Sequence, residues 1–465
     1  MGYSPAPTRA LATDLGRSLH HRLRDSVMRE HDTPHPQSPN PYPSMPYPVR
    51  DPALERQRLV QTWLDDLPMI NHYCFAGRRN FRNGFRVLVT GAGTGDASLY
   101  LAEQLKGHGA RIVHLEPHAA SMAMARERAH VRGLQNIEWI ERSLLDLPTL
   151  GLEPFDYISC SGVLHHLPDP DAGLRALRAV LKPDGALALM VHAQAGRAGV
   201  QQLRELLRMA HADEPDLARR IDSTRQILAS LPAGNGFRRA EDLHQDHRDG
   251  DAGLVNLLLL PHDHCWSVDA LYDWLSDDGR GGGHGLHLAF TDVQRGRAPY
   301  LPHMVLGVKP PDMMPQWRQL PARRQHAMAE LLGGTITMHV FYATRDAACT
   351  APYGDPAYVP FFFHEPLDGE TLARLFGSNR GQPFQLRHQH SGVVVTVHPG
   401  RYAPQILRLI DGRRSFGEIF AQLRRDWQGQ ATPPDDATLF ADFAESYDTL
   451  NSIDRLLLRH ADAAA

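Results

Sequence analysis

The chain has 465 residues, a net charge of −4 at pH 7 and a pI near 6.7. Its length exceeds that of one ordinary domain, so two or three domains are expected. The charge balance excludes the strongly basic proteins that are drawn to nucleic acid or anionic lipid by overall attraction, and four scattered cysteines without a CxxC pair argue against a disulfide framework.

The first 50 residues end in a proline-rich stretch, PHPQSPNPYPSMPYP at residues 34–48. This composition is typical of an extended polar tail, which we expect over residues 1–50. Because the N-terminal residues lack the apolar run of a signal peptide and no later run has the length of a membrane span, the expected location is the cytoplasm. Residues 51–70 are expected to form a helix at the start of the next domain.

A glycine-rich turn follows the first predicted strand, residues 87–89. An amphipathic helical stretch then separates this turn from a second apolar run, which ends at Glu116. The order of strand, glycine turn, helix and strand predicts an α/β nucleotide-binding unit, because glycine permits positive φ and lets the backbone approach a ligand closely. A carboxylate after the second strand can accept hydrogen bonds from two ribose hydroxyls. The glycines of the turn are Gly91, Gly93 and Gly95.

The same turn does not fit a dinucleotide. The GxGxxG fingerprint needs glycine at its sixth position so that the helix can approach the pyrophosphate, and this chain has Asp96 there. A carboxylate at that position would repel the pyrophosphate. The spacing therefore favours a ligand that carries adenosine without phosphate.

Further motifs follow in a consistent order. The third predicted strand, residues 137–140, leads into SLLDLP at 143–148; the fourth strand and its end, FDYISCSG at 155–162, lead into VLHHLP at 163–168; and residues 186–192 form a fifth strand. Together with GxGxG, these motifs resemble the class I S-adenosylmethionine-dependent methyltransferases, and the ubiquinone and menaquinone type in particular. The resemblance implies an α/β fold with a Rossmann-like, seven-stranded sheet and S-adenosylmethionine as cofactor.

The resemblance also implies which residues contact the cofactor. Glu116 would hold the ribose hydroxyls, and Asp146 would accept from the adenine amine. One departure is Val89, where the family commonly has an acid, and we expect Arg78 or Arg79 to form a forked contact with the methionine carboxylate; solvated arginines beside a strand are the alternative. The expected cofactor set is Gly91, Ala92, Gly93, Gly95, Glu116, Pro117, Asp146, Leu147, Ser161, Gly162 and Arg78.

Methyl transfer from a sulfonium is a displacement that needs alignment and, for an acceptor of high pKa, a base. We expect His165, His166 and Tyr73 to be the catalytic residues, with His192 as a further candidate base. The histidine pair would border the cleft at the carboxyl ends of the strands, although in many relatives such a pair mainly shapes the pocket. No metal is expected, because HDHC at 262–265 lacks the helical spacing of known zinc sites.

An insertion over residues 196–283 is expected between the fifth and sixth strands. Its helices are predicted at 199–209, 216–231 and 268–276, and such an insertion would cover the substrate pocket as a lid. The sheet needs two more strands, the last of them antiparallel.

Those last strands are predicted at residues 286–293 and 335–344. Residues 51–195 and 284–348 would then form the cofactor-binding core. The remaining residues, 350–465, are predicted to form a separate small α+β domain. Its expected elements are a strand at 392–398, a helix at 403–410, a helix opened by a capping box at 415–418, and a last helix at about 437–459.

The phrase ILRLIDGRRS at 406–415 resembles two known modules. One is the winged-helix module that binds leader peptides in peptide-modifying enzymes, and the other is the C-terminal winged domain of bacterial outer-membrane protein lysine methyltransferases. Both resemblances imply a polypeptide partner. DNA binding through the arginines of this region, and a packing or dimer surface, stay open.

Three functions fit these observations. The first is methyl transfer to a small molecule, such as a natural product or a quinone-like acceptor, which the HHLPD sequence after the fourth strand favours. The second is methylation of a peptide or protein that docks on residues 350–465. The third is a regulatory protein that binds the cofactor without turnover, for which Val89 is the argument. There is no strong nucleic-acid signal, a homodimer stays open, and the acceptor atom is not specified by the sequence.

Overall fold

The structure is a computed structural model, and contacts join residues 41–465 into one compact unit. Among the helices that it describes, none combines the length and the apolar character needed to cross a membrane. The tail expected over residues 1–50 lies outside the described residues up to residue 45. The described residues are 46–82, 84–276, 283–290, 298–307, 312–363, 368–379, 381–387, 394–427 and 432–463.

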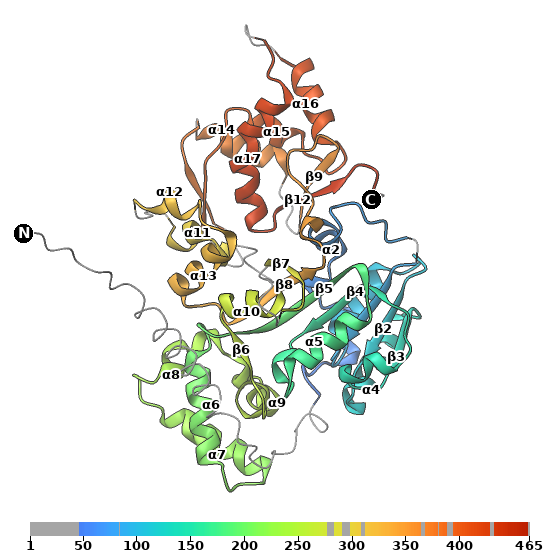
Figure 1. Ribbon diagram of the computed structural model, residues 1–465, viewed down its shortest axis with the longest axis vertical. Helices are drawn as coiled ribbons and strands as arrows, with labels where there is room; N and C mark the ends of the chain where they lie inside the picture. Colours follow the sequence, from blue (N-terminus) through green and yellow to red (C-terminus); the bar gives the residue numbers. More distant parts are fainter. Residues whose placement is uncertain are drawn as a thin grey trace, which may run out of the picture. The chain divides into compact units, whose positions relative to one another are not determined.

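A mixed β-sheet forms the centre of the unit. Its strands are β1 (Arg86–Thr90), β2 (Arg111–Leu115), β3 (Ile137–Ile140), β4 (Phe155–Ser161), β5 (Leu181–Ala193), β6 (Cys265–Trp266), β7 (His287–Phe290) and β8 (Met338–Thr344). They follow the order β3-β2-β1-β4-β5-β8-β7, with β6 beside the end of β5 (Figure 1). β1 to β5 are parallel to their neighbours, and β8 lies antiparallel between β5 and β7. The predicted α/β fold class and the antiparallel last strand are confirmed.

Both faces of this sheet are covered by helices. These are α2 (Leu67–Cys74), α3 (Asp96–Gln104), α4 (Ala119–Arg132), α5 (Pro170–Ala179) and α10 (Val268–Leu275). Side chains alternate along each strand, so Leu88 of β1 packs in the same core as α5 and α10, whereas Val87 and Val89 pack in the same core as α2 and α3. Strands that are buried on both faces explain the continuous apolar runs in the sequence.

Residues 51–70 do not form the continuous helix that we predicted. They form two short 3₁₀ turns, η2 (Pro52–Arg56) and η3 (Trp63–Asp65), and α2 begins only at Leu67. Pro68 explains where α2 begins, because a proline is accepted in the first turn of a helix and prevents a helix from continuing into that turn from upstream.

The insertion between β5 and β7 is mostly helical. The helices predicted at 199–209, 216–231 and 268–276 are confirmed as α6, α7 and α10, and Ser267 caps α10 as expected. Val200, Leu203 and Phe237 belong to a small core of its own. The elements before α10 are α6 (Ala198–Ala210), α7 (Leu217–Ser230), α8 (Gly236–Ala240), η6 (Glu241–Leu243), η7 (Asp246–Arg248), α9 (Gly250–Leu254) and the π-helical turn η8 (Val255–Leu259).

The last third of the chain adds helices and two small antiparallel sheets, β10 with β11 and β9 with β12. The predicted capping box is confirmed, since Ser415 and Glu418 bond each other's backbone N–H groups. The elements are η9 (Ala298–Tyr300), α11 (Pro302–Leu306), α12 (Met314–Trp317), α13 (Ala322–Gly333), η10 (Ala347–Cys349), β9 (Tyr358–Phe362), α14 (Gly369–Ser378), β10 (Phe384–Arg387), β11 (Val394–Val397), α15 (Ala403–Leu409), α16 (Phe416–Arg425), α17 (Asp436–Ser452) and β12 (Leu456–His460).

The last helix is shorter than the predicted 437–459, and its final residues form β12 instead. Asp454 has a φ of 53°, a conformation that a helix does not contain. Beyond it, Leu456 and Leu458 enter the core of the C-terminal region, and Leu457 enters the core of the sheet and α2. This alternation is the period of a strand.

Through β12, the C-terminal region contributes Leu457 to the core of the sheet and α2, although most of its apolar residues form a core of their own. The backbone N–H of Leu458 donates to Nδ1 of the fully buried His72 in α2 at 3.0 Å. Backbone bonds also join Ala351 to His72 and His460 to Gly77. The expected boundary near residue 350 and the winged-helix resemblance stay predictions.

Candidate functional site

The predicted glycine turn lies at the carboxyl end of β1. Gly91, Gly93 and Gly95 have φ values of 56°, 53° and 101°, which glycine adopts readily and other residues rarely do. A Cβ on Gly91 would lie 2.4 Å from Cγ2 of Val163, and a Cβ on Gly93 would lie 2.8 Å from the backbone oxygen of Tyr47. The turn therefore requires glycine for its conformation and for close approach.

Glu116 lies next to this turn with 3% of its surface exposed. One carboxylate oxygen accepts the N–H of Gly93 at 2.8 Å, and the other accepts the N–H of His118 at 3.0 Å and lies 2.6 Å from Nδ1 of His118. The carboxylate that we predicted to hold a ribose is thus placed at the glycine turn. Its contact with the ribose stays a prediction.

Asp96 has partners that the sequence analysis missed. Its carboxylate accepts Nη1 of the fully buried Arg128 at 2.8 Å and Nε of Arg50 at 3.0 Å. Thr94 in the same turn donates to the backbone oxygen of Pro48 at 2.8 Å. Because these two arginines offset the charge of Asp96, repulsion of a pyrophosphate by its carboxylate is no longer a strong argument. The absence of glycine at this position remains the reason why a dinucleotide does not fit. The segment around Pro48 lies over the turn, and its proline-rich sequence carried no signal for this contact.

The remaining predicted cofactor residues lie along the same edge. Asp146 accepts the backbone N–H of Ser143 at 3.2 Å in a capping box at the start of η4 (Leu144–Thr149). Leu147 in this turn is buried, whereas Pro117 and Ser161 are exposed after β2 and at the end of β4. Gly162 follows Ser161 with a φ of 78°. Four loops that carry predicted residues therefore meet at the carboxyl ends of the strands.

Three other predicted residues lie away from this edge. Arg78 is exposed, with its guanidinium 5.6 Å from the centroid of the Tyr358 ring. Arg79 pairs with Asp156, which is near the amino end of β4. Tyr73 stacks on Tyr342 of β8 at 5.7 Å inside the core, and its hydroxyl donates to Asp454. We therefore do not assign these three residues to the candidate site.

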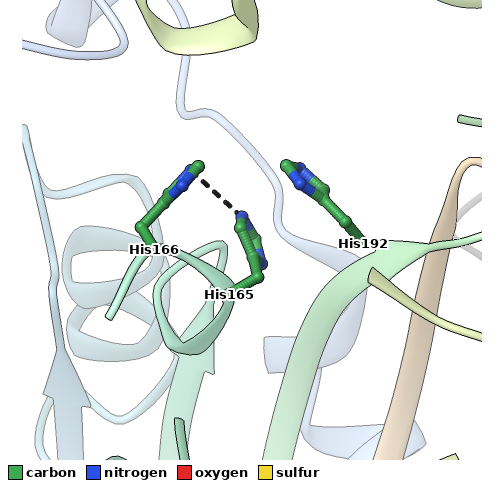
Figure 2. A group of neighbouring side chains, drawn as sticks. All are labelled: His165, His166 and His192. Carbon is green, nitrogen blue, oxygen red and sulfur yellow. Dashed lines mark hydrogen bonds between the residues drawn. The ribbon is translucent and has the colours of Figure 1, made fainter. Parts of the chain in front are cut away.

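His165 and His166 lie on the short turn η5 (Leu164–His166) after β4, and His192 projects from the neighbouring strand β5. Figure 2 shows the three imidazole rings turned toward one another. The Nε2 atoms of His165 and His166 are 3.1 Å apart, and the rings of His165 and His192 stack with centroids 3.6 Å apart. We call these three residues the histidine cluster. It brings both predicted catalytic histidines together with the further candidate base.

Residues of the insertion form hydrogen bonds with all three histidines of the cluster. The backbone N–H of His264 donates to the backbone oxygen of His165 at 2.9 Å, and Nδ1 of His166 donates to the backbone oxygen of His262 at 3.0 Å. Nδ1 of His192 bonds the carboxylate of Asp263, which also accepts Nη2 of Arg197 at 3.0 Å. Asp263 further accepts Nε2 of Gln201 at 2.8 Å and lies 3.4 Å from Nε of Arg204.

Burial controls the protonation of the cluster. It lowers the pKa of His166 to about 3, and it also lowers the pKa values of His165 and His192. Burial alone would raise the pKa of Asp263, but the hydrogen bond from His192 and the nearby Arg197 lower it below its ordinary value. The site therefore combines neutral imidazoles with an ionised carboxylate behind them.

Comparison with known proteins agrees with this geometry. The family described as "Methyltransferase domain" matches residues 88–187, and an uncharacterised protein of Synechococcus, syc1184_c, is 30% identical over 308 residues, which are 65% of this chain and 70% of that protein. This chain belongs to the S-adenosylmethionine-dependent methyltransferases. Its cofactor is S-adenosylmethionine, as the motifs predicted.

Ubiquinone biosynthesis O-methyltransferases match a shorter segment. Those of Acinetobacter baumannii and Histophilus somni are 29% and 36% identical over 102 and 106 residues, 22% of this chain in each case. The match spans less than half of either enzyme, 41% and 42%. The solved structure of PKMT2 from Rickettsia typhi has the same fold over 86% of this chain and 76% of its own, with a TM-score of 0.56 at 13% identity.

Sequence reasoning identified His165 and His166 but missed Asp263 as their support. Asp263 lies inside the HDHC segment, whose residue types indicate metal ligands and give no sign of a partner on the fifth predicted strand. Its partner His192 is 71 positions away. The signal that was available was the histidine at the end of the fifth predicted strand, because neighbouring parallel strands bring their carboxyl ends together.

Proposed function

We propose that this methyltransferase transfers the methyl group to a hydroxyl of a small molecule that binds beside the histidine cluster. The observation that carries the proposal is the position of the cluster, which lies at the carboxyl ends of β4 and β5 next to the glycine turn at the end of β1. Ligands of open α/β sheets bind at this edge. Cofactor and acceptor would then occupy neighbouring strands.

A direct packing contact supports this arrangement. Val163 lies against Gly91 of the glycine turn, and His165 follows Val163 by two residues. The turn that would hold the cofactor and the turn that carries the histidines therefore touch. We assign ribose binding to Glu116 and the adenine side to Asp146 and Leu147.

The neutral imidazoles of the histidine cluster support a hydroxyl as the acceptor group. A hydroxyl must lose its proton as the oxygen attacks the methyl group, and a neutral imidazole can accept a hydrogen bond from the hydroxyl and hold it in line with the methyl group. The relatives from Acinetobacter and Histophilus carry the name O-methyltransferase. Residues 262–264 of the insertion cover the histidines, which favours a small acceptor over a polypeptide.

The test uses the full chain with S-adenosylmethionine that carries a deuterated methyl group and a panel of phenols, catechols and hydroquinones. Mass spectrometry is expected to detect a labelled methyl ether. His166→Ala should lower kcat/KM at least about 100-fold while the Kd for the cofactor changes less than about twofold, and His130→Ala, on the exposed side of α4, should leave both unchanged.

Labelled polypeptide in a cell extract, without any labelled small molecule, would overturn the proposal in favour of the peptide or protein substrate. Transfer to a small molecule that His166→Ala leaves intact would reject the assigned role of the cluster.

A further inference from the structure

We infer that the histidine cluster is a binding site for one divalent transition-metal ion of the zinc type. This inference deepens the proposed function, on which it rests for the role of the ion, whereas the binding of the ion can be measured without any acceptor. The site consists of His165, His166 and His192, with Asp263 behind it.

The distances between the ring nitrogens suit a common ion. Each histidine offers one nitrogen, and the three atoms lie within 4.8 Å of one another. Zn–N bonds of about 2.0–2.1 Å at tetrahedral angles place two ligand nitrogens roughly 3.4 Å apart. The Nε2 atoms of His165 and His166 are already 3.1 Å apart.

The hydrogen bonds outside the cluster prepare two of the rings as ligands. Nδ1 of His166 faces the backbone oxygen of His262, and Nδ1 of His192 faces the carboxylate of Asp263. Both acceptors require a proton on Nδ1, so Nε2 of each ring keeps its lone pair. A carbonyl or carboxylate on the far nitrogen is the arrangement that metal-ligating histidines almost always have.

The third ring, that of His165, lacks a hydrogen-bond partner for one of its two nitrogens among the described residues. His165 is 1% exposed, and its Nδ1 has no hydrogen-bond partner among the described residues. In the structure its Nε2–H must donate to Nε2 of His166, which leaves the lone pair on the buried Nδ1 of His165 unsatisfied. The ring of His165 is stacked on that of His192 at a tilt of 26°, so binding of the ion requires His165 to rotate about its side-chain bonds until its nitrogen faces the ion in the plane of the ring.

A neighbouring group of possible ligands is less suitable. His192, Asp263 and Cys265 also bring ligand atoms together, but Asp263 already pairs with Arg197 and Arg204. The pair of guanidinium groups would oppose a cation placed on that side of the carboxylate. Asp263 therefore acts as support for His192 and not as a ligand.

Three histidine ligands leave the fourth position of a tetrahedral ion open, and the oxygen of the acceptor would occupy it. The ion makes the hydroxyl more acidic, so its proton passes to water. The oxygen then forms a bond to the methyl carbon while the carbon–sulfur bond breaks, and sulfur keeps that electron pair as neutral S-adenosylhomocysteine. No oxidant or reductant is needed.

Zinc binding by the full chain tests the inference directly. The purified protein is stripped with a chelator, Zn²⁺ is returned in competition with a chromophoric chelator, and bound zinc is counted by mass spectrometry. We expect one zinc per chain, and a loss of affinity of at least about 100-fold in His166→Ala and in His192→Ala. Asp263→Asn should weaken binding about 10–100-fold by removing the support of His192. The matched control is His130→Gln, which changes an exposed histidine of α4 outside the cluster and should bind zinc as the wild type does.

Absence of zinc from the wild-type chain, or zinc that His166→Ala and His192→Ala retain, would overturn the inference. Binding of S-adenosylhomocysteine by the same variants, measured by calorimetry, checks that they are folded. A protein that binds zinc through these residues and methylates no small molecule would sink the proposed function and leave the metal site standing.

Discussion

At the carboxyl ends of β1 and β2, the polar contacts join residues that are close in sequence, such as Gly93 and Glu116, which are 23 positions apart. At the ends of β4 and β5 they join distant residues, such as His166 and His262, which are 96 positions apart. The contacts of Glu116 on the cofactor side therefore come from local motifs that the sequence displays, whereas the segment around Pro48 that covers the glycine turn does not. The acceptor side depends on where the insertion folds, so it can change between relatives without altering the cofactor side.

Of the variants that distinguish the acceptor side from the cofactor side, Asp263→Ala is expected to change the free energy of unfolding most. This variant leaves Arg197 and Arg204 buried without their carboxylate, so we expect the free energy of unfolding to fall by about 3–5 kcal/mol. Urea denaturation measures it. Asp269→Ala removes an exposed pair with Arg323 and should cost less than about 1 kcal/mol; equal losses in the two variants would show that the Asp263 pairs are not what stabilises the acceptor side.

Glu116→Ala addresses the cofactor side alone. The loss of hydrogen bonds to a charged group should weaken S-adenosylmethionine binding by about 1.5–3 kcal/mol, as calorimetry would measure, and the zinc affinity should stay unchanged. Glu138→Ala, on the exposed side of β3, is the matched control. Unchanged cofactor affinity in a folded Glu116→Ala protein would remove this residue from the ribose site.

Tyr73→Phe examines a residue that was predicted to be catalytic and belongs to neither side. Its hydroxyl donates to the buried Asp454, so the variant should lower the free energy of unfolding by about 1–3 kcal/mol and leave kcat unchanged. Thermal unfolding and a turnover assay would measure the two quantities. A large drop in kcat with unchanged stability would restore the catalytic assignment.

The smallest effect is expected from Thr94→Val. The substitution removes the hydrogen bond to the backbone oxygen of Pro48 and keeps the shape of the side chain, at a cost of about 0.5–1.5 kcal/mol. If the segment around Pro48 stabilises the glycine turn, cofactor affinity should fall with stability. Faster proteolysis before residue 50 would report its release, and unchanged proteolysis would count against this contact.

Features that depend on local contacts could be predicted from the sequence, and features that depend on distant contacts could not. The glycine turn and the order of the strands were predictable because each is specified within a few residues. The helix expected over 51–70 was wrong, and Pro68 accounts for the part of it next to α2, where no helix can run in from upstream. The last helix was drawn too long because Leu450, Ile453 and Leu457 have helical spacing, although Leu457 lies in a strand. The support of His192 by Asp263 could not be read locally, since it needs the fold of the insertion.

The hydrogen bond between His72 and Leu458 joins residues that are 386 positions apart. On the ribosome, the sequence of α2 therefore emerges long before the strand that buries its imidazole. Until that strand has been synthesised, the nascent chain presents the unpaired face of α2 to water and to chaperones, although domains generally fold as units from the N-terminal side during synthesis. The helix α2 therefore reaches its final environment only after Leu458 has been synthesised.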